Sequence, residues 1–282
     1  MPVLDPLAGS QWRSDPDRLH YALRQLDTDP VRLAALLGVC ADYRLGSYYE
    51  RLWRALLDLA PDVHVLAHNV PVRQQRRSLG ELDLVTETAD GSVIHFELAI
   101  KFYLGQPELA GSGQRSPQSA WWGPDPKDRL DIKVDRLVTH QLPLAARQAG
   151  RLTHLPRIDR SCAWLQGCLF YPHSVQMAAA EQAHVPGWRH AWCYRNELED
   201  AYLEQWVRLP HKRWLAPPVD AGQRNETSPS QTPAERPGAP LMLVSKARRD
   251  QPDAARLLVM PDGWPDRIIP PRCGSASGQD RA

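Results

Sequence analysis

Apolar and polar side chains alternate along residues 93–102, the pattern of a β-strand with two unlike faces. One face is apolar and suited to a core, whereas the other carries His95, Glu97, Ala99 and Lys101. A similar alternation along residues 81–84 sets Asp83 apart from two leucines. Turn-forming residues connect the two runs, so the sequence predicts a β-hairpin with Asp83 and Glu97 on its polar face.

Helical spacing and capping residues predict five helices, which cover about residues 15–25, 29–37, 47–57, 127–141 and 197–206. Pro143 is expected to end the fourth of them, because proline cannot continue an undistorted helix. Ser47 and Glu50 match a capping box at the start of the third helix. This match gives Glu50 a structural role that competes with a functional one.

Further strands are expected near residues 63–72, 161–171, 188–194, 241–244 and 257–260, the last two forming a small hairpin or an edge addition. The fold class is therefore α/β, and 282 residues favour one domain with appended elements. The expected parts are an N-terminal helical layer (1–45), a core with its extension (46–215), a polar Pro-rich linker (216–240) and a small C-terminal segment with a loose tail (241–282).

Composition limits the choice of partners. The chain has 34 Lys and Arg against 33 Asp and Glu, so nucleic-acid binding would need local basic patches. The five cysteines form no C-x-x-C pair, and the N-terminus lacks the basic and apolar regions of a secretory signal. No apolar segment approaches the length of a membrane span. A cytoplasmic protein without a membrane partner is the expectation.

The two acids on the predicted hairpin suggest a metal site. Carboxylate oxygens bind Mg²⁺ while leaving positions for water and a phosphate oxygen. A nearby lysine ammonium can orient the attacking water or offset charge that develops on the phosphate. Asp83, Glu97 and Lys101 therefore fit metal-assisted phosphodiester cleavage. The alternative is that these charges simply cover the solvated face of a half-buried sheet.

A helix with Glu50, a Gly80-x-x-Asp83 strand and a Glu97 strand resemble the core of the PD-(D/E)xK nuclease superfamily. The segments Tyr48–Glu50, Gly80–Leu84 and His95–Leu104 are similar to the bacterial domain-of-unknown-function family 1853, over roughly residues 30–215. The resemblance implies a restriction-endonuclease-like core of helix, three strands, helix and strand. It also implies a Mg²⁺ or Mn²⁺ ion held by Asp83 and Glu97, with the Leu98 carbonyl as a further ligand and Glu50 in support.

The resemblance is incomplete at the lysine. The superfamily places a lysine two residues after the second acid, where this chain has Ala99. Lys101 lies on the same strand face about 6.6 Å further along. If its long side chain reaches back, a metal-dependent nuclease follows, and if it does not, the fold is a binding module.

Residues after the Glu97 strand supply candidates for substrate binding. Trp121 and Trp122 end a long polar loop and can stack on bases, with one ring expected to be buried and the other exposed. Arg129, Lys133 and Arg136 form a basic stripe with His140 that suits a phosphate backbone, although interleaved aspartates also fit a solvated helix face. By resemblance, Gln141 matches the glutamine of RecB-like nucleases.

These observations favour Mg²⁺-dependent hydrolysis of phosphodiester bonds in nucleic acid, with DNA as the expected substrate. Asp83, Glu97, Lys101 and Glu50 form the proposed catalytic group. The alternative is a catalytically impaired nucleic-acid-binding or protein-interaction module on the same fold. The sequence gives no indication of oligomeric state.

Overall fold

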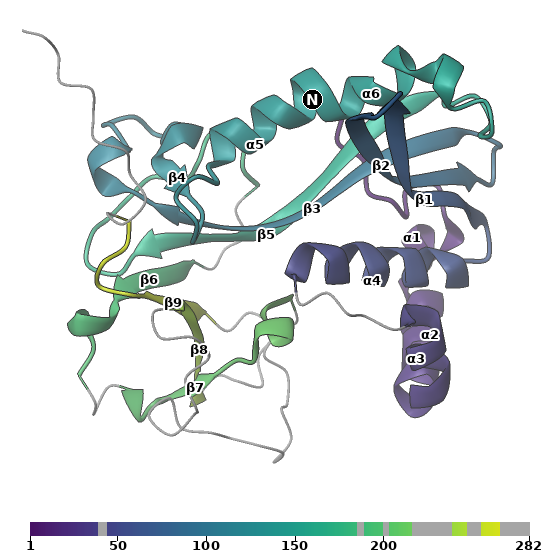
Figure 1. Cartoon of the computed structure of the whole chain (residues 1–282). Helices are drawn as coiled ribbons and strands as arrows, with labels where there is room; N and C mark the ends of the chain where they lie inside the picture. The colour runs from purple at the N-terminus through teal and green to yellow at the C-terminus, as the bar shows by residue number, and fades with distance from the viewer. Residues whose placement is uncertain (39–43, 185–188, 200–202, 216–238, 247–254, 266–282) are drawn as a thin grey trace, which may run out of the picture. The chain divides into compact units, whose positions relative to one another are not determined.

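The computed structural model describes residues 1–38, 44–184, 189–199, 203–215, 239–246 and 255–265. It shows a mixed α/β protein with a nine-stranded sheet and several helices (Figure 1). Eight strands lie in the order β1-β2-β3-β5-β6-β9-β8-β7, and β4 pairs with β3. The α/β class predicted from the sequence is confirmed.

The chain forms two compact units. The first contains Met1–Phe102, Asp131–Cys168 and Pro210–Ala216, and the second contains Tyr103–Leu130, Leu169–Leu209 and Pro217–Ala282, within the described ranges. Most of the predicted linker, residues 216–238, and the predicted tail, residues 266–282, lie outside the described residues. The candidate catalytic residues all belong to the first unit.

Four helices open the first unit: α1 (Gln11–Ser14), α2 (Pro16–Thr28), α3 (Pro30–Leu37) and α4 (Leu45–Leu59). The predicted starts of α2 and α3 are confirmed, because each helix has its proline in the first turn. The Asp29 carboxylate caps α3 by accepting a hydrogen bond from the backbone N–H of Arg32 at 2.9 Å. Among the described residues, no helix has the length and apolar character needed to cross a membrane.

The predicted start of α4 was wrong. The helix begins at Leu45 with Arg44 as its N-cap, so Ser47 lies inside the first turn rather than before it. Glu50 therefore does not close a capping box. The apolar face of α4 packs on the sheet through Tyr49 and Leu57, which share a buried cluster with Leu84 and Phe96.

Three antiparallel strands follow: β1 (Val63–Gln74), β2 (Arg77–Thr88) and β3 (Val93–Gly105). The predicted hairpin between β2 and β3 is confirmed, with Glu87 opposite Val93. The predicted alternation of apolar and polar residues along β2 is not confirmed. Leu82 packs in one core cluster and Leu84 in another, so the regular two-residue pattern breaks at Asp83.

The second face of these strands is covered by a continuous helical segment, α5 (Leu130–Arg136), η3 (Leu137–Gln141) and α6 (Leu142–Arg147) (Figure 1). The polar face of β3 is therefore buried rather than solvated, and residues 93–99 are all buried. Pro143 was expected to end the helix, but it lies in the first turn of α6 after a π-helical turn. There the Leu142 N–H donates to the Leu137 carbonyl, so the proline starts a new helical segment.

Strand β5 (Arg160–Pro172) is the neighbour of β3. Ser161 lies beside His95, and Gly167 lies beside Lys101, so the two strands run in the same direction. The first unit thus contains, in chain order, a helix, three strands, a helical segment and a further strand.

The second unit contains short elements: β4 (Trp121–Trp122), β6 (His190–Tyr194), β7 (Trp206–Arg208), β8 (Leu241–Ser245) and β9 (Arg256–Met260). The predicted pairing of β8 with β9 is confirmed as antiparallel, and β9 also runs parallel to β6. The predicted helix over 197–206 was wrong at both ends. A 3₁₀ turn occupies Arg195–Glu197, and Trp206 begins a strand, while residues 200–202 lie outside the described ranges.

Gly167 permits the close approach of β5 to β3. Its φ is +145°, and a Cβ atom there would collide with the Lys101 carbonyl oxygen. We expect Gly167→Ala to lower the free energy of unfolding by about 2 kcal/mol or more, because the Lys101 carbonyl belongs to a strand of the sheet and cannot move aside easily. Urea denaturation measures the change.

A matched control is Gly46→Ala in the first turn of α4, where the added methyl meets no atom within 4 Å. This variant should be about as stable as the parent or more stable by up to about 1 kcal/mol, since alanine favours helix. Equal stability of the two variants would contradict the proposed role of Gly167.

Candidate active site

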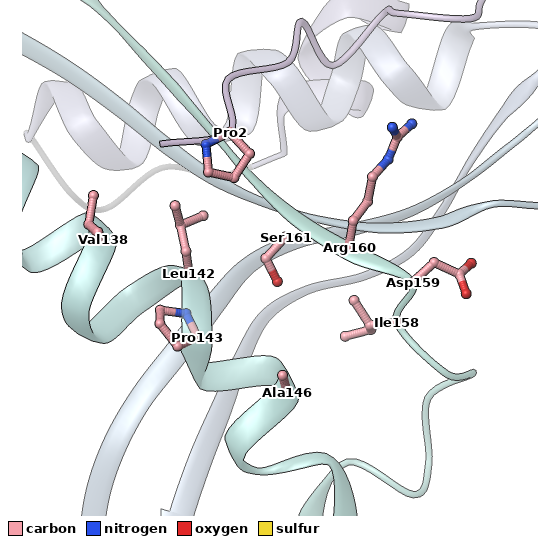
Figure 2. Close-up of a pocket in the computed structure, with 9 residues that line it drawn as sticks. All are labelled: Pro2, Val138, Leu142, Pro143, Ala146, Ile158, Asp159, Arg160 and Ser161. Carbon is pink, nitrogen blue, oxygen red and sulfur yellow. The ribbon is translucent and has the colours of Figure 1, made fainter.

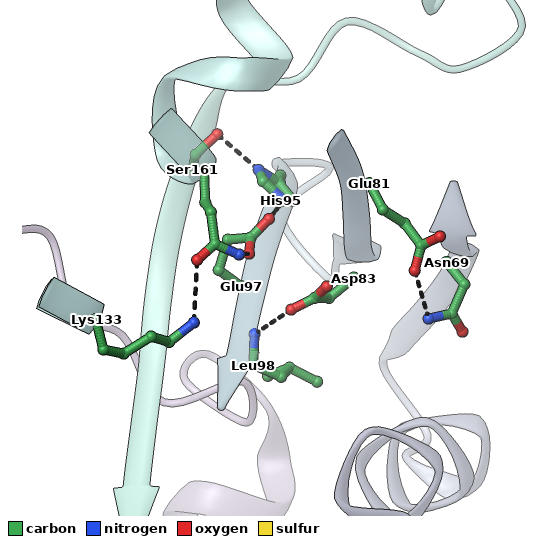
Figure 3. A network of polar contacts seen from close by, with 9 residues as sticks. Asn69, Glu81, Asp83, His95, Glu97, Leu98, Lys133 and Ser161 are labelled. Atoms are coloured by element: carbon green, nitrogen blue, oxygen red, sulfur yellow. Dashed lines mark hydrogen bonds and ion pairs between the residues drawn. The ribbon is translucent and has the colours of Figure 1, made fainter. Parts of the chain in front are cut away.

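Asp83 and Glu97 meet where strands β2 and β3 separate. The ladder pairs Leu84 with Phe96, and one residue further along Asp83 faces Glu97. There the Asp83 Oδ2 atom accepts a hydrogen bond from the Leu98 N–H at 2.9 Å, in place of a backbone carbonyl (Figure 3). Burial raises the pKa of Asp83, and the two carboxyl groups lie close enough for the charge of Glu97 to raise it further. The juxtaposition expected from the sequence is therefore present.

The Glu97 carboxyl is almost completely buried, with 1% of the residue exposed, and both of its oxygens accept hydrogen bonds. His95 Nε2 lies 3.0 Å from Oε1, and Gln141 Nε2 from η3 donates to Oε2. His95 Nδ1 lies 3.0 Å from the Ser161 hydroxyl on β5 (Figure 3). Three elements thus fix the position of this carboxyl.

Burial lowers the pKa of His95 to about 4, so the ring is neutral near pH 7. A neutral imidazole has one donor and one acceptor nitrogen. When Glu97 is ionised it can only accept, so the ring proton is then on Nε2 and Nδ1 accepts from the Ser161 hydroxyl. The alternation along β3 predicted the correct face for His95 but no role for it, and no sequence pattern pointed to Ser161.

Glu50 reaches the same region from α4. Asn69 on β1 donates from Nδ2 to Glu50 Oε2 at 3.3 Å. It also donates to Glu81 Oε1 at 3.1 Å (Figure 3). Burial, and then the negative charge of Asp83, raise the pKa of Glu50 to about 7. Asn69 has a φ of +49°, a left-handed conformation that asparagine tolerates. Its position opposite the irregular residue Asp83 was not predicted from the sequence.

Lys133 supplies positive charge to the two carboxyls. It extends from α5, and its Nζ atom donates to Gln141 Oε1 at 3.0 Å (Figure 3). Its charge opposes the rise in the pKa values of Glu97 and Asp83 that burial produces. Burial, followed by the charge of Lys101, lowers the pKa of Lys133 itself. Lys101 is half-buried on β3, close enough to influence Lys133 electrostatically.

The predicted basic stripe does not form one surface. Lys133 points into the site, Arg136 and His140 are exposed, and Arg129 belongs to the second unit. Gln141 belongs to the hydrogen-bond network around Glu97. Sequence spacing could not show this division, because the π-helical turn changes the rotation of the helix between Lys133 and Gln141.

The two tryptophans lie in the second unit. Trp121 is fully buried, donates from Nε1 to the Ser116 hydroxyl at 2.8 Å and packs edge-to-face on Tyr171. The prediction that Trp121 stacks on a base is therefore corrected, because its ring is part of the core. Trp122 is half-buried and donates to the Ser119 carbonyl at 2.9 Å. The expectation that the two rings differ in exposure holds only in this weaker form.

The family model described as domain of unknown function (DUF1853) matches residues 2–256. The chain belongs to the DUF1853 family. No curated protein and no solved structure gives a significant match to it. The functional assignment for this DUF1853 chain therefore depends on the chemistry of its own residues.

The donor set of this DUF1853 chain suits a hard divalent cation. Among the described residues no group of three or more His, Cys, Asp or Glu side chains has metal-binding geometry. Asp83 and Glu97 nevertheless offer carboxylate oxygens with lone pairs beyond the hydrogen bonds that they accept. Mg²⁺ is commonly held by one or two carboxylates and several waters, so two adjacent carboxyls are sufficient.

A pocket of about 350 Å³ lies between the η3–α6 segment and the start of β5 (Figure 2). Its wall is mainly apolar, with Val138, Leu142 and Ile158 among the lining residues. Ser161 also lines it, with its hydroxyl engaged by His95. Its ionisable residues are Asp159 and Arg160, and Asp159 accepts a hydrogen bond from the Val93 N–H.

The clustered acids predict a specific pH dependence of stability. Burial and the charge of Glu97 raise the pKa of Asp83 from 3.8 to about 7. Between these values the folded chain retains a proton that the unfolded chain loses, so a rise in pH costs stability. Asp83→Asn removes this titration. The free energy of unfolding of the parent, relative to this variant, should fall as the pH rises from about 4 to about 7.

Urea denaturation of the metal-free parent and variant at several pH values provides the measurement. Glu87→Gln, a change of the same kind on strand β2 away from the site, should leave the pH dependence of the parent unaltered. A constant difference between the parent and Asp83→Asn across this range would mean that Asp83 titrates normally.

Proposed function

We propose that this chain is a divergent member of the PD-(D/E)xK superfamily. It hydrolyses phosphodiester bonds of nucleic acid, and DNA is the expected substrate. The observation that carries the proposal is the closeness of Asp83 and Glu97 at the end of the β2–β3 pairing, with the half-buried Lys133 near both carboxyls. The order of helix, three strands, helical segment and strand supports the same assignment.

In this proposal Asp83 and Glu97 would hold Mg²⁺ or Mn²⁺, and the Leu98 carbonyl would be a further ligand. The bound ion would polarise the phosphate and lower the pKa of a coordinated water. Water is the nucleophile. Its oxygen bonds to phosphorus and gives up a proton to the solvent, while the phosphorus–oxygen bond to the leaving group breaks and the leaving oxygen takes up a proton. Glu50, hydrogen-bonded to Asn69, supports the site through its charge next to Asp83.

Lys133 takes the role that the superfamily gives to the lysine missing at position 99. Its ammonium acts electrostatically on both carboxyls, and Gln141 links it to Glu97. A cation fixed at this place can offset the charge that develops on the phosphate without reorganisation. Lys101, whose charge acts on Lys133, is the second candidate for the same role.

The alternative function is a module that binds nucleic acid or another protein without cleavage. One observation favours it: both Glu97 oxygens already accept hydrogen bonds, from His95 and Gln141, and such a carboxyl can be purely structural. The two functions differ in whether the protein cleaves nucleic acid at all.

Replacement of the acids tests the chemistry. Asp83→Asn and Glu97→Gln each remove a charge with almost no change in volume, so cleavage of DNA in Mg²⁺ should become undetectable. Glu87→Gln on the same β2 strand should keep the activity of the parent. Cleavage is measured on labelled single-stranded and double-stranded DNA and RNA. Equal turnover by all four proteins would point to a contaminating nuclease and remove the support for the proposal.

Replacement of the lysines decides between the two cations. Lys133→Met should lower turnover by about 10²-fold or more, the scale of one lost electrostatic contact in a transition state. Lys101→Met should have a smaller effect. Binding of DNA in Ca²⁺, which also binds oxygen ligands, separates loss of chemistry from loss of affinity. A larger loss of turnover for Lys101→Met than for Lys133→Met would assign the electrostatic role to Lys101 on β3.

A further inference from the structure

A pocket of about 370 Å³ opens beside Asp83, between the β1–β2 hairpin and the η3–α6 segment. Arg73 and Ser78 line it from the hairpin, and Arg136 and His140 line it from the helical side. Asp83 and Gln141 also belong to its wall. The pocket is therefore continuous with the proposed active site, and all of its lining residues lie in the first unit.

The basic and acidic side chains that line this pocket differ in whether they have hydrogen-bond partners. The guanidinium groups of Arg73 and Arg136 are exposed, and neither makes a hydrogen bond or an ion pair with the described residues. The Glu81 carboxylate, in contrast, accepts a hydrogen bond from Asn69 at 3.1 Å. The His140 Nε2 atom lies 3.0 Å from the Leu79 carbonyl, which requires Nε2 to be the donor nitrogen. Two arginine forks therefore remain available to an anionic ligand.

The backbone fixes the distance between the two walls. Gly80 on β2 has a φ of +149°, and a Cβ atom there would lie 2.7 Å from Leu144 Cδ2. The missing side chain lets β2 approach α6 closely. The arginines at the rim thus extend from elements held in contact rather than from a freely moving loop.

We propose that this pocket binds the backbone phosphate next to the one that is cleaved, through Arg73 and Arg136. The inference rests on the proposed function. Two carboxyls, Glu81 and Asp83, also line the pocket. A guanidinium presents parallel N–H donors that match two oxygens of one phosphate, so the two arginines provide the phosphate contacts. Because Asp83 forms part of the wall, a phosphate held there lies beside the metal-binding acids. Its role is to position the strand.

The test measures binding separately from cleavage. Single-stranded DNA is titrated with the parent, Arg73→Gln and Arg136→Gln in Ca²⁺ at several salt concentrations, with fluorescence anisotropy as the readout. Each substitution should weaken binding by about 10-fold, the scale of a lost charge-assisted hydrogen bond. The slope of log K against log salt should fall by about 0.7 for each phosphate contact removed.

The matched control is Arg77→Gln. Arg77 is exposed on the same hairpin and lies outside the pocket lining, yet its loss changes the net charge equally. Binding by Arg77→Gln should stay within about twofold of the parent. Equal losses for Arg73→Gln, Arg136→Gln and Arg77→Gln would show a general field effect and overturn the pocket proposal.

Two further comparisons separate the explanations. A 5′-phosphorylated and a 5′-hydroxyl oligonucleotide should bind equally if the pocket holds an internal phosphate. A preference for the 5′-phosphate that the two pocket variants lose would assign the pocket to a strand end and overturn the internal site. Unchanged binding by both variants, together with cleavage lost in Glu97→Gln, would leave the proposed function standing and reject only the pocket. Absence of salt-dependent DNA binding by the parent would reject both.

Discussion

The burial of the Glu97 carboxyl is the constraint on which the site depends. A carboxylate removed from water is costly unless its oxygens are hydrogen-bonded and its charge is balanced. Here His95 and Gln141 form hydrogen bonds with the two oxygens. The positive charge of Lys133, which is hydrogen-bonded to Gln141, offsets the negative charge of Glu97. These partners come from β3, η3 and α5, so the carboxyl is stable only when the helical segment is seated on the sheet.

The same arrangement concentrates negative charge. Glu50 from α4, Asp83 from β2 and Glu97 from β3 influence one another, and burial raises the pKa of each to about 7. Such a site gains stability from a proton or from a cation. A protein that only needed a stable core would be better served by apolar residues at these positions. The three acids therefore cost stability unless a proton or a cation offsets their charge.

Irregular backbone accompanies the site on each side. The π-helical turn before Pro143, the left-handed Asn69 and the positive φ of Gly80 all surround Asp83 and Gln141. Irregularities of this kind re-aim side chains and tend to occur at functional positions. In this chain they separate Lys133 from the exposed residues of its own helix and interrupt the alternation of β2.

Local pattern was sufficient for several features. The two-residue alternation of β3, its hairpin with β2 and the Asp–Pro starts of α2 and α3 depend on neighbouring residues, and each was predictable. Only the tertiary structure decided that α4 starts before Ser47, that Trp121 is buried and that Lys133 faces the acids. The rotation of a helix is set by what it packs against and by its local winding. Neither is contained in the spacing of charged residues.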